Sequence, residues 1–209
     1  MLPSWDELTE QVGWARQRGV SLHLDGARLW ESAPFYGRSH AEIAGLFDSV
    51  YVSFYKSLGA IAGAALAGSE ELVAEARLWQ RRHGGNLVSM YPFVLSARAG
   101  LRERLERMTA YCDRAKKIAD TLRLIAGVRI TPDPPHANLM HVYLPVDGER
   151  LLDESAALAR ATGVALFTRT RPSDVPGYCA VEISIGDAAG AITDTELDSL
   201  LTELIERAR

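Results

Sequence analysis

The chain has 209 residues, 47% of them hydrophobic, and a formal net charge of −4 at pH 7. This apolar content suffices for one sizeable core or two small ones, and the acidic balance argues against general nucleic-acid binding. No run approaches the roughly 18–20 apolar residues of a membrane span, and the first residues lack the basic and apolar regions of a signal peptide. The two cysteines lack metal-like spacing, so we expect a soluble, cytoplasmic protein without nucleic-acid or membrane partners.

The first ninety residues alternate predicted helices with short hydrophobic strands. We expect helices over 4–18, 39–47 and 70–82, and strands over 20–25, 49–55 and 63–69. Ser39 with Glu42 three residues later has the spacing of a capping box. The crossover between the first two strands is long enough for parallel pairing, and the apolar second strand favours a sheet covered on both faces. An α/β layer is therefore expected for residues 1–90.

The second half has a different pattern. A helical stretch over 91–126, interrupted near Thr109, precedes short strands at 128–130, 139–144, 164–168 and 178–185 and helices at 149–162 and 193–208. We therefore expect three parts, which are an α/β domain (1–90), connecting helices (91–126) and a smaller α+β domain (127–209).

One lysine lies at the end of an apolar strand, in "VYVSFYKSLGA". Lys56 is one of only three lysines among 23 basic residues, and Asp25 ends the strand before the crossover. Ligands of open α/β sheets bind outside the carboxyl ends of the strands, and Gly26 and Gly59 would leave room there. The two residues form a structural ion pair, or the lysine simply extends into solvent. Alternatively, Lys56 is a Schiff-base lysine and Asp25 keeps the ring nitrogen of pyridoxal phosphate (PLP) protonated.

Longer stretches around these two residues carry a family resemblance. "LHLDGARLW" (22–30), "FDSVYVSFYKSLGA" (47–60), "GAALAGS" (63–69) and "RRHGG" (81–85) resemble the threonine aldolase and beta-eliminating lyase family. These are PLP enzymes with the aspartate-aminotransferase-like fold, called fold type I. The resemblance implies the C-terminal part of a large PLP domain, with a mostly parallel sheet and helices on both faces, followed by a small α+β domain. It also implies that the N-terminal part, with its glycine-rich phosphate turn, is lacking.

The resemblance assigns a role to each polar residue near the lysine. Lys56 would form the Schiff base, Asp25 would bond the pyridine nitrogen, and Arg28 would lie near the cofactor or the substrate carboxylate. Alternation places His23 on the same strand face as Asp25, where it either orients the aspartate or is a core histidine. A metal site at His-x-Asp is less favoured because no partner with metal spacing lies nearby.

Several positions depart from the family pattern. Tyr55 and Ser57 flank Lys56 where the family has serine and glycine, and Ser53 is a candidate for the phosphate contact. Glu182 stands where many relatives carry an arginine for the substrate carboxylate. That role then moves to Arg169 or Arg171, unless both are exposed loop residues or the substrate differs.

The resemblance implies a PLP-dependent lyase that cleaves the Cα–Cβ bond of a β-hydroxy amino acid, with threonine giving glycine and acetaldehyde. A homodimer or homotetramer is expected. The alternatives are a catalytically inactive, truncated paralogue that works through protein contacts, or another PLP reaction such as transamination or cysteine lysis.

Overall fold

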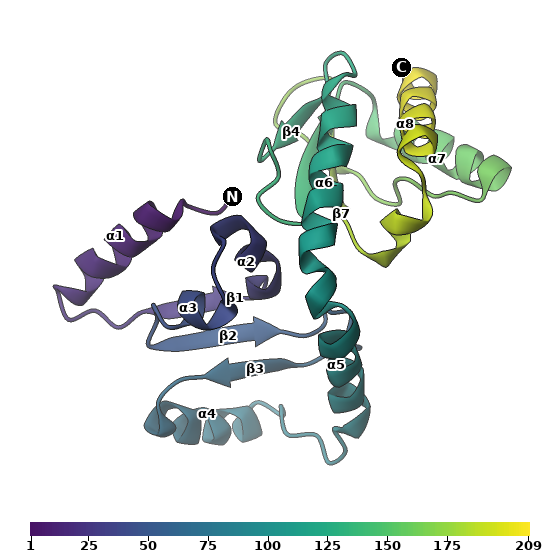
Figure 1. Cartoon of the computed structure of the whole chain (residues 1–209). Coiled ribbons are helices and arrows are strands. Elements are labelled where there is room, and N and C mark those ends of the chain that lie inside the picture. The colour runs from purple at the N-terminus through teal and green to yellow at the C-terminus, as the bar shows by residue number, and fades with distance from the viewer. The chain divides into compact units, whose positions relative to one another are not determined.

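The computed structural model describes all 209 residues, which form two compact units (Figure 1). The N-terminal unit comprises Leu2–Thr109 and the C-terminal unit Ala110–Arg209. The first contains a three-stranded sheet and the second a four-stranded sheet. The boundary falls within the expected connecting helices, and the expected three-part division of the chain remains a prediction.

The sheet of the N-terminal unit combines one parallel and one antiparallel pair. Strand β1 (His23–Gly26) runs parallel to β2 (Ser49–Ser53), and β2 runs antiparallel to β3 (Ala64–Ala67). The parallel crossover between the first two strands is therefore confirmed. In its register Asp25 lies opposite Tyr51, so these two side chains project from the same face of the sheet.

Six helical segments accompany this sheet, and two of them begin with the capping boxes formed by Ser4 with Glu7 and by Ser39 with Glu42. The segments are α1 (Trp5–Arg16), α2 (Leu29–Tyr36), α3 (His40–Ala44), α4 (Glu70–Arg82), α5 (Tyr91–Glu103) and the 3₁₀ turn η1 (Leu105–Arg107). The expectations missed α2, which contains Pro34 and has no side-chain cap at its start. Both features weaken the sequence signal for a helix.

Helices α2 and α3 cover one face of the sheet. Leu29, Ile43 and Val50 form the buried cluster, and Leu24 and Val52 of the same sheet face pack against it. Helix α4 has the predicted bounds but no buried residue, and β3 is exposed throughout. The N-terminal unit therefore has a small core and a broad exposed apolar surface.

The C-terminal unit is built on an antiparallel sheet of order β4-β5-β7-β6. Its strands are β4 (Arg129–Thr131), β5 (Leu139–Leu144), β6 (Arg171–Pro172) and β7 (Cys179–Ser184), and its helical segments are α6 (Met108–Arg123), α7 (Gly148–Thr162), the 3₁₀ turn η2 (Asp187–Ala191) and α8 (Asp194–Ala208). Every second residue of β5 is buried, which is the pattern of a sheet that packs one face on a core.

The strand expected at 164–168 is wrong. The hydroxyl of Ser155 in α7 donates to the Phe167 carbonyl at 2.8 Å and accepts from the Phe167 backbone N–H at 3.2 Å. Because a side chain already satisfies both backbone groups of Phe167, this segment crosses the unit without sheet pairing. None of the helices in either unit is long and apolar enough to cross a membrane.

Candidate active site

The candidate site lies where β1 and β2 end in the N-terminal unit. Because these strands are parallel, their carboxyl ends meet at one edge of the sheet. Asp25 is the third residue of β1, and Lys56 follows β2 by three residues. Both side chains are exposed, and one carboxylate oxygen of Asp25 accepts from the Ala27 backbone N–H at 3.2 Å. The fold therefore presents a carboxylate and an amine at the same end of adjacent strands.

Polar side chains continue along the sheet face that carries Asp25. The Nδ1 atom of His23 lies 2.8 Å from the Ser49 hydroxyl, and the hydroxyl groups of Tyr51 and Tyr55 lie 3.2 Å apart. The bond to Tyr55 raises the pKa of Tyr51 to about 12, with burial and the nearby charges of Tyr55 and Asp25 as smaller causes. Tyr55, which departs from the family pattern, thus forms a hydrogen bond with Tyr51, the residue opposite the candidate aspartate in the sheet.

The turn that carries Lys56 is held from within and from α5. The Gly59 backbone N–H donates to the Lys56 carbonyl at 2.8 Å, and Leu58 is almost completely buried. Arg104 donates to the Leu58 carbonyl at 3.2 Å, and a Cβ added at Gly100 would lie 2.2 Å from that same oxygen. Helix α5 therefore packs directly against the backbone of the lysine's turn.

The glycines near the site do not leave space for a ligand, contrary to expectation. A Cβ at Gly26 would lie 2.4 Å from the Tyr51 carbonyl oxygen, and one at Gly59 would overlap the Arg104 guanidinium. Gly59 also has a φ of +68°, which favours glycine. Both positions are filled by the protein's own atoms, so glycine is required there for packing.

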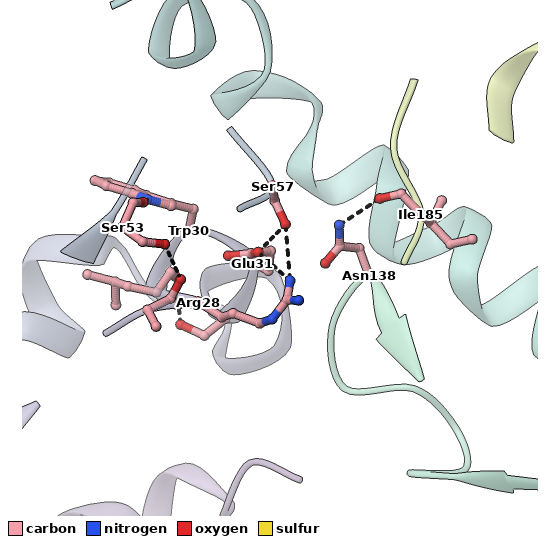
Figure 2. A network of polar contacts seen from close by, with 10 residues as sticks. Arg28, Trp30, Glu31, Ser53, Ser57, Asn138 and Ile185 are labelled. Atoms are coloured by element: carbon pink, nitrogen blue, oxygen red, sulfur yellow. Dashed lines mark hydrogen bonds and ion pairs between the residues drawn. The ribbon is translucent and has the colours of Figure 1, made fainter. Parts of the chain in front are cut away.

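Arg28 belongs to a network of polar contacts with Glu31 and Ser57 (Figure 2). Its Nη1 atom lies 3.2 Å from Glu31 Oε1 and 3.4 Å from the Ser57 hydroxyl, which in turn donates to the same carboxylate oxygen. Glu31 is fully buried, whereas the Arg28 side chain is 33% exposed. Arg28 and Asp25 also line one pocket of about 180 Å³.

Ser53 has a structural position behind this edge. It is fully buried, its hydroxyl donates to the Ala27 carbonyl at 2.7 Å, and its own carbonyl accepts from Trp30 Nε1 at 2.7 Å (Figure 2). These bonds tie the end of β2 to the turn between β1 and α2. The hydroxyl proton of Ser53 is thus used inside the protein.

The remaining predicted residues lie in the C-terminal unit. Arg169 and Arg171 line a pocket of about 540 Å³ together with Glu182. Glu182 Oε2 lies 3.7 Å from Arg171 Nη2 and 3.4 Å from His141 Nε2, while Arg169 forms no ion pair. The charge of Glu182 is therefore balanced within the unit, and Arg169 is the guanidinium in this pocket that remains available to an anion.

Sequence reasoning missed Glu31. It lies within the apolar segment "LWESAP", where no helix was expected. The signal that points to it is Ser57, which supplies a hydroxyl where the family pattern has glycine.

The fold and this site define a class of protein. A crossover-linked α/β unit with a carboxylate and an amine at its strand ends, followed by an antiparallel α+β unit, has the architecture of fold type I PLP proteins, and solved structures of that class match it. Residues 2–145 match the family model described as Beta-eliminating lyase. The chain belongs to the beta-eliminating lyase family.

Individual relatives agree with this assignment. The chain is 34% identical over 206 residues to the aldolase vrtJ of Penicillium aethiopicum, a match that covers 94% of this chain and 48% of that protein. It is 31% identical to low-specificity L-threonine aldolase 1 of Arabidopsis thaliana, with coverage of 71% and 41% respectively. The crystal structure of a candidate L-allo-threonine aldolase from Listeria monocytogenes EGD-E is 40% identical, with a TM-score of 0.92 and coverage of 99% and 57%. The chain thus spans about half the length of these relatives.

Proposed function

We propose that this chain carries the lysine-bearing part of a PLP-dependent lyase that cleaves the Cα–Cβ bond of a β-hydroxy amino acid. Threonine, giving glycine and acetaldehyde, is the model substrate. The observation that carries the proposal is the arrangement of Asp25 and Lys56 at the same end of adjacent parallel strands. The similarity to threonine aldolases supports the same reaction class.

The chemistry of the residues present fits PLP. Lys56 offers an exposed amine on a hydrogen-bonded turn. Asp25 offers an exposed carboxylate whose charge is one of the causes of the raised pKa of Tyr51. When bound, PLP supplies a ring that accepts the electron pair released by bond cleavage. Lys56 would hold the cofactor covalently, and Asp25 would keep a proton on the ring nitrogen.

Arg28 is the candidate for the carboxylate of the amino-acid substrate. Its side chain is one-third exposed and lies in the same unit as Lys56 and Asp25. A planar guanidinium matches the geometry of a carboxylate and stays charged at any working pH. His23, bonded to Ser49 and next but one to Asp25 on its strand, would help to orient that aspartate.

Three further assignments belong to the proposal. Arg169 and Arg171 are candidates for a contact to an anionic substrate group within the pocket that they line in the C-terminal unit. The protein would work in the cytoplasm as a homodimer or homotetramer.

Turnover of threonine tests the function. The 209-residue chain supplied with PLP is expected to release acetaldehyde and glycine, and Lys56→Ala is expected to abolish the release. Lys116→Ala is the matched control, since Lys116 is an exposed lysine on α6 paired only with Asp113, and it should retain activity. Activity that survives in Lys56→Ala would contradict the proposal.

Two competing functions need separate tests. A catalytically inactive chain is favoured by the departures Tyr55 and Ser57 beside the lysine. Titration with PLP distinguishes it, because saturable micromolar binding would rule it out. Another PLP reaction would keep the same cofactor residues, and product analysis with threonine, cysteine and an amino acid plus keto acid would identify it.

A further inference from the structure

We propose that Glu31 and Ser57 are positioning residues that hold the guanidinium of Arg28 ready for a carboxylate and tie it to the turn of Lys56. The inference rests on the proposed function, because it assigns Arg28 to the substrate carboxylate. It adds two residues that neither touch the substrate nor belong to the family pattern described above. Arg28, Glu31 and Ser57 all lie in the N-terminal unit, and Figure 2 shows their contacts.

The first step is the buried charge. Glu31 has no exposed surface, and a buried carboxylate is costly unless it is paired and hydrogen-bonded. Its Oε1 atom receives both the Arg28 guanidinium at 3.2 Å and the hydroxyl of Ser57. Arg28 therefore supplies a counter-charge to the buried carboxylate of Glu31.

The second step is the origin of the three residues. Arg28 directly precedes α2, and Glu31 follows it by three residues in the first helical turn, so the chain fixes their spacing. Ser57 comes from the turn after β2, 26 residues away from Glu31 in sequence. It directly follows Lys56. The Ser57–Glu31 bond is thus a link between the start of α2 and the turn of the candidate cofactor lysine.

The third step is the part of Arg28 that remains available. The network uses only Nη1, and no bond inside the protein uses Nε or Nη2. Two donors in one plane are what a carboxylate accepts in a bidentate pair. With Nη1 anchored, the guanidinium cannot rotate freely, so the entropy of ordering it is lost before the substrate arrives.

The test compares ligands that differ only in the carboxylate. Glycine and glycinamide are titrated against the PLP-loaded chain and against its variants Glu31→Gln, Ser57→Ala and Ser57→Gly. Glu31→Gln is expected to weaken the binding of glycine by about tenfold, which is the scale of one hydrogen bond to a charged group. The affinity for glycinamide should stay within about twofold of the parent value. Ser57→Ala and Ser57→Gly should weaken the binding of glycine by about threefold and leave the binding of glycinamide nearly unchanged. Threonine turnover should show the loss in KM rather than in kcat.

A control and a second readout separate the possible failures. Glu203→Gln removes the carboxylate of an exposed ion pair with Arg207 and should change the affinity for neither glycine nor glycinamide. Nitrogen-15 NMR of the Arg28 guanidinium needs no cofactor, and it should show restricted rotation in the parent chain and faster rotation in Glu31→Gln and Ser57→Ala. Equal losses for glycine and glycinamide, or unchanged rotation, would overturn the inference. A chain that takes up no PLP but shows the rotation change would refute the proposed function and leave the positioning intact.

Discussion

The two units of this protein differ in the side chains that they bury completely. Among the largest fully buried side chains, only Leu58 and Glu31 belong to the N-terminal unit, and the others, all apolar, fill the C-terminal unit. In the N-terminal unit these two side chains belong to the turn of Lys56 (Leu58) and to the partner of Arg28 (Glu31). The C-terminal unit has a large apolar core, whereas the N-terminal unit has a small apolar cluster and a fully buried glutamate near the candidate site.

This contrast teaches where stability and function reside. An apolar core is insensitive to pH and tolerates little loss of volume, whereas a buried polar network depends on every partner being present. Helix α4 and strand β3 bury nothing, so the buried residues of the N-terminal unit belong to its other segments. All four tryptophans lie in that unit, so tryptophan fluorescence follows it specifically.

The largest effect should come from the C-terminal core. Leu144→Ala removes a side chain with no exposed surface and should lower the free energy of unfolding by about 3 kcal/mol. Val50→Ala, in the small N-terminal cluster, should cost about 1–2 kcal/mol. Urea unfolding followed by circular dichroism and tryptophan fluorescence measures both. Equal losses at the two positions would break the comparison between the units.

Breaking the buried network should come next. Glu31→Ala leaves Arg28 and Ser57 without their shared acceptor and should destabilise the N-terminal unit by about 2 kcal/mol, a value reduced for the exposure of Arg28. The tryptophan fluorescence transition in urea measures this loss. Glu203→Ala, at an exposed pair, should cost less than about 0.5 kcal/mol. A loss of stability in Glu31→Ala as small as that in the control would mean that the network does not stabilise the N-terminal unit.

The packing of α5 on the lysine's turn gives a smaller effect. Gly100→Ala places a Cβ 2.2 Å from the Leu58 carbonyl oxygen, so the helix must shift, at a cost of about 1–2 kcal/mol. Gly13→Ala on α1 meets nothing within 4 Å and should stabilise by about 0.5–1 kcal/mol. Thermal unfolding of the pair should therefore show opposite signs. Stabilisation by both substitutions would show that α5 does not press on this turn.

The smallest effect concerns pH. The pKa of Tyr51 is raised to about 12, so the folded state resists ionisation that begins near pH 10 in the unfolded chain. Its contribution to stability is therefore complete below pH 10 and is lost as the pH rises towards 12. Tyr55→Phe removes the principal cause and should bring the Tyr51 pKa closer to 10. Ultraviolet titration of phenolate measures it, and an unchanged Tyr51 curve would show that the hydroxyl pair is not formed.

Much of the fold was predictable because its signals are local. Serine and glutamate at capping-box spacing predicted the start of α3, and the short apolar segment at 139–144 predicted β5. The signals failed where tertiary contacts override local pattern. A helix containing Pro34 was missed, and Phe167 satisfies its backbone through Ser155 instead of a neighbouring strand.

The candidate site was predictable in its outline only. Asp25, Arg28 and Lys56 follow from a motif in the chain, whereas Glu31 acquires meaning only through a bond to Ser57 that spans 26 residues. The glycines were misinterpreted because sequence cannot tell space left for a ligand from space filled by Arg104 or a neighbouring strand.

Covalent trapping of the cofactor tests the central claim most directly. The chain is incubated with PLP, reduced with borohydride and digested, and the modified peptide is identified by mass spectrometry. We predict saturable labelling of Lys56, with little on the exposed Lys116 and Lys117. Labelling spread evenly over the three lysines, or absent from Lys56, would contradict the assignment of this edge of the sheet as a PLP site.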